Sequence, residues 1–148
     1  VPGPSMDSTL ERVVHLDIPS GVQMVETVNA VVRELASAAG FDQDSTQAIQ
    51  TAVHEAVVNA IVHGSDREET QRVKLDIAVR AGGLEVRVED EGRGFDPTNV
   101  PDPLAPQNLT RSSGRGIFLM RKLMDEVTFS RLASGGMEVR MLKHLLPR

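Results

Sequence analysis

Apolar and polar residues alternate at five places along the chain, loosely in the first and strictly in the others, and this pattern predicts five strands. The first segment is rich in β-branched residues and ends at Pro19. The other four form two pairs, separated by Gly82–Gly83 and by Gly135–Gly136, so each pair predicts an antiparallel hairpin. The predicted strands are residues 10–18, 73–79, 84–88, 127–132 and 137–142.

Between the first and second strands the apolar residues change to a helical period. Residues 22–39 predict one helix, with Ser20 as its N-cap and Gly40 at its end. Asp42 predicts the N-cap of a second helix, whose central part is residues 51–65. The apolar stripe of that helix consists of Ile49, Val53, Ala56, Ala60 and Ile61.

A third helix is predicted from Gly114 onward, after residues 95–113, which contain four prolines and show no period. Such a long loop inside a domain predicts a lid or a binding loop. The element order predicts an α/β (α+β) fold, a two-layer sandwich with one mixed, mostly antiparallel sheet and helices on one face. We expect a single domain over residues 9–148, preceded by a flexible N-terminus or vector-derived remnant over residues 1–8.

The composition excludes several classes of protein. The chain has four Phe and no Trp or Tyr, so it lacks the aromatic platforms that stack single-stranded nucleic acid. Its formal net charge is −5 without a basic block, which weighs against binding a phosphate backbone. It has no cysteine, so disulfides and thiolate chemistry are excluded. No apolar run approaches the roughly 18 residues that cross a membrane. We therefore expect a cytoplasmic protein without membrane or direct nucleic-acid partners.

Three polar residues of the central helix, Glu55, Asn59 and His63, follow one another at intervals of four. At 3.6 residues per turn they lie in one file along the edge of the apolar stripe. A carboxylate one turn before an amide suits holding a water or hydroxyl with one group and a hard cation with the other. The simpler alternative is the solvated shoulder of an amphipathic helix. His63 fits a structural role better than a ligand role.

Two glycine-containing segments carry further candidate chemistry. Residues 90–95 (DEGRGF) follow a strand, where the Asp90 carboxylate suits accepting from an exocyclic amine such as that of adenine. Residues 112–117 (SSGRGI) begin a helix, where free N–H groups and the helix dipole favour a phosphate. Taken alone, each is also a common turn or helix start. Neither forms a complete dinucleotide fingerprint or a Walker A loop.

Together the three segments supply the parts of a site for ATP with Mg²⁺. In this combination and order the sequence resembles the GHKL ATP-binding family, and within it the bacterial anti-sigma-factor serine/threonine kinases. Residues 55–64 resemble its N-box, residues 90–95 its G1 box and residues 114–125 its G2 box. The resemblance covers nearly the whole chain and implies the Bergerat, or histidine kinase-like ATPase, fold.

The resemblance also implies a role for each matching residue. Glu55 is the implied general base, and Asn59 is the implied ligand of the Mg²⁺ that bridges the ATP phosphates. Asp90 is implied to bind the adenine amine. The other implied nucleotide-binding residues are Gly92, Gly94, Gly114, Arg115, Gly116 and Ile117.

The implied function is a kinase that sequesters a sigma factor and phosphorylates a Ser or Thr of a small STAS-type antagonist protein. The resemblance further implies a homodimer. The chain departs from the family at Met137, where a Thr commonly places a hydroxyl near the adenine. Two alternatives therefore stay open: a nucleotide-gated binding module with little turnover, and an interaction protein with a degenerate pocket.

Overall fold

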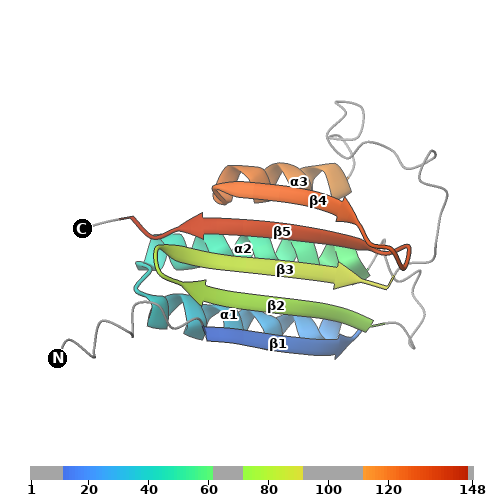
Figure 1. Ribbon diagram of the computed structural model, residues 1–148, viewed down its shortest axis with the longest axis horizontal. Coiled ribbons are helices and arrows are strands. Elements are labelled where there is room, and N and C mark those ends of the chain that lie inside the picture. Colours follow the sequence, from blue (N-terminus) through green and yellow to red (C-terminus); the bar gives the residue numbers. More distant parts are fainter. Residues whose placement is uncertain (1–11, 62–71, 92–111, 147–148) are drawn as a thin grey trace.

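The computed structural model describes residues 12–61, 72–91 and 112–146. They form two layers, a five-stranded sheet and three α-helices packed on one of its faces (Figure 1). This arrangement confirms the predicted two-layer α+β sandwich. Among these residues, no helix combines the length and the apolar character that crossing a membrane requires.

The sequence predicted a mixed, mostly antiparallel sheet, and all the described pairings are antiparallel. Its strands are β1 (Arg12–Pro19), β2 (Arg72–Arg80), β3 (Gly83–Asp90), β4 (Glu126–Arg131) and β5 (Met137–His144). Their order across the sheet is β1-β2-β3-β5-β4. β3 and β4 run in the same direction, but they are not neighbours because β5 lies between them and pairs antiparallel with both. This insertion removes the parallel pairing that a mixed sheet would contain.

The first helix begins differently from the prediction. A short 3₁₀ turn, η2 (Val22–Met24), precedes α1 (Val25–Ala39). The N-cap residue of α1 is therefore Met24, whose side chain makes no capping hydrogen bond. The N-cap of the α-helix is therefore not Ser20, as predicted, because the first three residues of the predicted helix form the 3₁₀ turn η2.

The connection between the first two helices follows the prediction. Gly40 ends α1 in the left-handed conformation, with φ 101°. Asp42 then caps α2 (Gln43–Asn59) by accepting a hydrogen bond from the Ser45 backbone N–H at 2.7 Å. Both signals are local, which explains why the sequence alone revealed them.

The core lies between the sheet and the helices and consists almost entirely of aliphatic residues. The predicted stripe of α2 is buried, with no member more than 7% exposed. Fully buried residues from β2 and β3 face it, among them Leu75, Ile77, Leu84 and Val86. Each such side chain contributes about 1.5–3 kcal/mol on burial. This packing fixes α2 on the sheet, and so it fixes the polar residues along the edge of the stripe.

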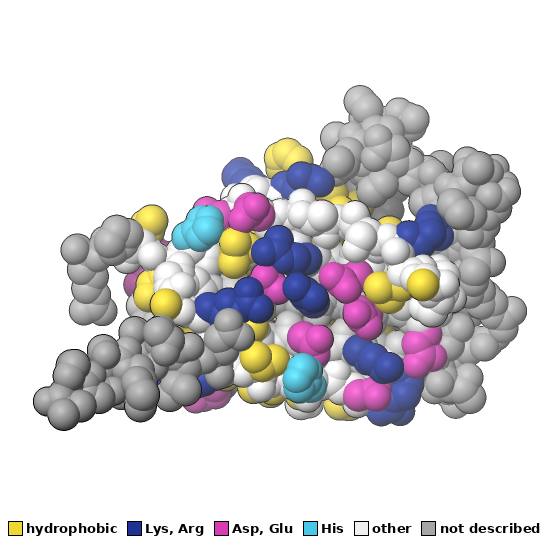
Figure 2. All heavy atoms as spheres, viewed as in Figure 1, with side chains coloured by type: hydrophobic (Ala, Val, Ile, Leu, Met, Phe, Trp, Pro, Cys, Tyr) yellow, Lys and Arg dark blue, Asp and Glu magenta, His cyan; other side chains and the backbone are white. Residues whose placement is uncertain are grey.

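The opposite face of the sheet is charged, and Figure 2 shows Lys and Arg side chains gathered over its middle with Asp and Glu beside them. Glu85 is only 3% exposed on this face because arginines cover it. Its carboxylate lies 2.9 Å from both Arg87 Nε and Arg140 Nη2. Burial by itself raises the pKa of Glu85, but the hydrogen bonds from these two arginines outweigh it, so the pKa falls below its ordinary value.

Two carboxyl groups, Glu89 on β3 and Glu138 on β5, lie directly opposite each other on this charged face. Burial, followed by the hydrogen bond with Glu138 and its charge, raises the pKa of Glu89. A carboxyl group whose pKa is higher in the folded protein stabilises it below the ordinary pKa. That stabilisation is lost as the pH rises through the folded pKa. The pair therefore opposes folding at neutral pH.

Replacing Glu138→Gln removes one of the two like charges and supplies an amide donor to Glu89. We expect the free energy of unfolding at neutral pH to rise by about 0.5 kcal/mol, a value reduced by solvent screening. The gain should vanish well below the ordinary pKa of 4.5, where Glu89 is protonated in the parent. Urea unfolding at the two pH values measures both effects. The control is Glu126→Gln. Glu126 lies opposite Leu142, so this substitution should leave the free energy of unfolding unchanged at both pH values. An equal gain at both pH values would contradict the explanation that the charge of Glu138 opposes that of Glu89.

Candidate functional site

α2 and α3 (Ser112–Leu123) meet at Gly116, which is buried. A Cβ atom at Gly116 would lie 2.9 Å from Glu55 Oε2 and 3.4 Å from Asn59 Nδ2. Any larger residue at this position would displace the end of the Glu55 side chain, so glycine lets the backbone of α3 lie this close to both polar groups without moving them. The structure therefore brings together three of the predicted site residues, two from the central helix and one from the glycine-rich helix start.

The residues around this contact explain how it is held. Ile117, the next residue of α3, is 6% exposed and belongs to the hydrophobic core, so it anchors the helix rather than facing solvent. Arg115, on the other side of Gly116, is exposed. Glu55 and Asn59 are half-buried at the edge of the core. The arrangement leaves a carboxylate, an amide and a guanidinium near the first turn of α3, which also contains Gly114.

Asp90 is the last residue of β3, and the turn between β4 and β5 packs against it. The Met137 backbone N–H donates a hydrogen bond to Asp90 Oδ1 at 3.3 Å. A Cβ atom at Gly136 would lie 2.1 Å from the Asp90 carbonyl oxygen, so this position also requires glycine. The carboxylate is thus held by the chain segment in which the usual Thr is replaced by Met137.

The role of Gly136 was missed at the level of the sequence, where Gly135–Gly136 was interpreted only as a turn. The signal was present in the pair of glycines. Gly135 has φ 101°, the conformation that a tight turn needs, whereas Gly136 does not have a positive φ. A second glycine beside one that already makes the turn indicates a close approach of another backbone.

The two groups of residues lie at the same end of the sandwich. Figure 1 shows the end of α2, the end of β3, the start of α3 and the β4–β5 turn at this end. The predicted residues Gly92 and Gly94, most of the lid, and His63 lie outside the described residues. The described part of the site therefore comprises Glu55, Asn59, Asp90 and the start of α3.

The donor groups at this end fit Mg²⁺ bound together with phosphate. Carboxylate and amide oxygens are the hard ligands that Mg²⁺ prefers. Within the described ranges there is no cluster of three or more His, Cys, Asp or Glu side chains that could hold a metal ion.

Comparison with known proteins assigns the family. Residues 18–143 match the family model described as the histidine kinase-like ATPase domain. The chain belongs to this family. The resemblance found in the sequence is thereby confirmed, and the matched region contains every described residue of the site.

Curated relatives share the name serine-protein kinase RsbW. The relative from Bacillus velezensis is 31% identical over 144 residues, which are 93% of this chain and 89% of the relative. The relative from Listeria monocytogenes is 29% identical over 126 residues, which are 81% of this chain and 80% of the relative. The chain is similar to these kinases over most of its length and over most of theirs.

Two solved structures have the same fold. The SiaB–SiaC complex from Pseudomonas aeruginosa contains a chain with a TM-score of 0.67 and 13% identity, covering 95% of this chain and 94% of that chain. The RsbU and RsbW domains of a Mycobacterium tuberculosis protein give a TM-score of 0.62 and 21% identity, covering 90% of this chain and 32% of that chain. At these identities the likeness shows the fold alone.

The substitution Gly116→Ala tests the contact between α2 and α3. The new Cβ meets the flexible end of the Glu55 side chain, so we expect the free energy of unfolding to change by less than about 1 kcal/mol. Magnesium-dependent ATP affinity should fall roughly tenfold or more, because Asn59 and Glu55 are displaced. Urea unfolding and calorimetric titration measure the two quantities.

The matched control is Gly21→Ala, whose Cβ would meet another flexible side-chain end, Gln23 Oε1, at 2.6 Å. Gly21 lies just before η2, so ATP affinity should not change. Unchanged ATP affinity in a folded Gly116→Ala variant would contradict the assigned site.

Proposed function

We propose that this protein is an ATP-dependent protein serine/threonine kinase of the anti-sigma-factor type. The observation that carries the proposal is the contact at Gly116, which sets Glu55 and Asn59 side by side at the start of α3. A carboxylate, an amide and a helix N-terminus are the groups that phosphoryl transfer from a magnesium–nucleotide complex needs. The relatives named serine-protein kinase support the same conclusion.

Each part of the nucleotide has proposed contacts in this site. Asp90 accepts a hydrogen bond from the adenine amine, with Gly92 and Gly94 allowing the backbone to approach. Gly114, Arg115 and Gly116 hold the phosphates, and Ile117 keeps α3 seated in the core. Asn59 holds Mg²⁺, which neutralises phosphate charge when it is bound.

In the proposed reaction Glu55 acts on the hydroxyl of the protein substrate. The serine or threonine oxygen forms a bond to the γ-phosphorus of ATP, and the bond from that phosphorus to the bridging oxygen breaks, releasing ADP. The proton of the hydroxyl goes to the Glu55 carboxylate. Little else is required, because positioning and charge neutralisation dominate the catalysis of phosphoryl transfer.

The proposal extends to the partners of the protein. The phosphorylated substrate is a small STAS-type antagonist protein, and the sequestered protein is a sigma factor. The active form is a homodimer that works in the cytoplasm. To identify both partners, the protein is immobilised and used to recover binding proteins from the source cell, with and without ATP. The antagonist should gain the mass of a phosphate when ATP is present, whereas the sigma factor should not.

The substitution Glu55→Gln tests the proposed base. We expect the rate of phosphate transfer to the recovered antagonist to fall about a hundredfold or more, while ATP binding persists, because the amide cannot accept the proton. Mass spectrometry of the antagonist follows the transfer, and calorimetry follows ATP. Glu26→Gln at the start of α1 is the matched control and should transfer phosphate at the parent rate. Transfer by Glu55→Gln at the parent rate would refute the mechanism.

One observation favours a second candidate, a nucleotide-gated binding module with little turnover. Asp90 receives a main-chain N–H from Met137, but the hydroxyl that the family commonly has at this position is missing. A pocket tuned in this way suits holding a nucleotide as a signal rather than consuming it. ATP binding together with the absence of any phosphorylated partner would favour this candidate over the kinase.

A further inference from the structure

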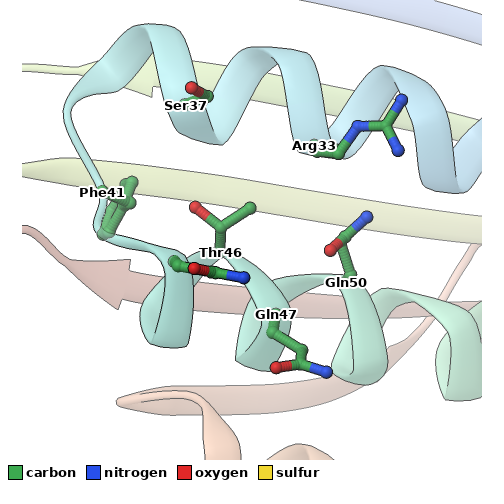
Figure 3. Close-up of a pocket in the computed structure, with 7 residues that line it drawn as sticks. Arg33, Ser37, Phe41, Thr46, Gln47 and Gln50 are labelled. Carbon is green, nitrogen blue, oxygen red and sulfur yellow. The ribbon is translucent and has the colours of Figure 1, made fainter.

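A second feature of the helical layer lies away from the candidate nucleotide site. A cleft of about 420 Å³ separates α1 from the first half of α2. Its lining residues are Arg33, Ser37, Phe41, Gln43, Thr46, Gln47 and Gln50 (Figure 3). The volume is in the range of ligand-binding pockets, about 300–1,000 Å³. Glu55 and Asn59 follow these residues at the other end of the same helix.

Thr46 gives this cleft a buried polar group. The residue is only 8% exposed, and its side chain points into the space between the two helices (Figure 3). Its hydroxyl is the polar group that this side chain contributes to the lining of the cleft. A hydroxyl can both donate and accept a hydrogen bond, so it can bond with a polar group that enters the cleft.

Arg33 gives the cleft its charge. Its guanidinium forms no ion pair with any described residue, although the chain has a formal net charge of −5. No Asp or Glu is among the lining residues, so the cleft favours an anion. A guanidinium binds a carboxylate through two parallel hydrogen bonds, which makes a carboxylate the best-matched group.

The spacing of the lining residues indicates the shape of the occupant. On α2, Gln43 and Gln47 form one file and Thr46 and Gln50 form another, each at an interval of four residues. From residue 43 to residue 50 these files extend about 10 Å along the helix, the length of about three residues of extended chain. Glutamine amides both donate and accept hydrogen bonds, as does a peptide main chain. Gln50 Nε2 already donates to the Asn29 carbonyl oxygen at 3.3 Å, so Gln50 offers mainly its amide oxygen to an occupant.

We propose that this cleft binds a short extended segment of a partner protein that carries an Asp or Glu side chain. The carboxylate of that side chain pairs with Arg33. The main chain of the segment bonds with the glutamine amides and with the Thr46 hydroxyl, while Phe41 closes one end of the cleft. This inference concerns a separate site and does not depend on the proposed kinase activity.

The probe is the blocked tripeptide acetyl-Ala-Glu-Ala-amide, with acetyl-Ala-Gln-Ala-amide as its neutral match, titrated into isotopically labelled full-length protein and followed by NMR. We expect the amide signals of Arg33, Thr46 and Gln50 to shift with the acidic peptide. The parent should bind the neutral peptide roughly tenfold more weakly than the acidic one, since one charge-assisted pair is lost. The variant Arg33→Gln should bind the acidic peptide more weakly than the parent does, by the same factor. The control Arg121→Gln, an exposed arginine of α3, should bind like the parent.

Two further measurements separate the explanations. Thr46→Val should weaken peptide binding and Thr46→Ser should restore it, so a folding defect of the valine variant does not decide the outcome. Equal binding of both peptides, or an unaffected Arg33→Gln variant, would overturn the proposal. Succinate binding at the same residues as tightly as the peptide would also overturn it, in favour of a site for free carboxylates. Arg33→Gln should keep the parent's ATP affinity, so the two sites are tested independently.

Discussion

The close packing of the α3 backbone on two polar side chains of α2 is the contact on which the candidate site depends. At Gly116 a Cβ atom would lie 2.9 Å from Glu55 Oε2, so the main chain of α3 packs directly beside this carboxylate. The core holds this contact from behind, because Ile117 and Met120 of α3 are buried against the sheet and α2. Two half-buried polar groups thereby share one environment with a helix N-terminus. The alternative from the sequence was that Glu55 and Asn59 only border the apolar face of an amphipathic helix and face solvent. Residues in that role would not need the backbone of another helix packed against them.

The order of the strands provides the second constraint. Because β5 lies between β3 and β4, the turn before β5 is brought beside the end of β3. The Met137 N–H and the Gly136 backbone then close on Asp90. If β4 were the neighbour of β3, this turn would lie one strand further away. The antiparallel order is therefore part of the site as well as part of the fold.

The two faces of the molecule stabilise it in different ways. The helical layer buries aliphatic side chains, whereas the open face of the sheet holds Glu85 beneath arginines that keep it ionised. Within the helical layer, α2 carries the candidate catalytic residues near its end and the polar cleft near its start. The same helix thus carries the residues of both proposals, the nucleotide site near its end and the peptide cleft near its start.

The sequence by itself determined the elements, because hydrophobic period, hairpin glycines and the Asp42 cap act between residues that are close along the chain. It also determined the family, through three motifs in one order, and it named the candidate residues. Tertiary structure decided which of these meet. The contact of Gly116 with Glu55 and Asn59, the approach of Gly136 to Asp90, the burial of Glu85 and the cleft at Thr46 all join residues from different elements. The all-antiparallel sheet was likewise decided by tertiary structure. The position of β5 between β3 and β4 depends on how strands distant in the sequence pair, and the alternation of apolar and polar residues within one strand does not specify that pairing.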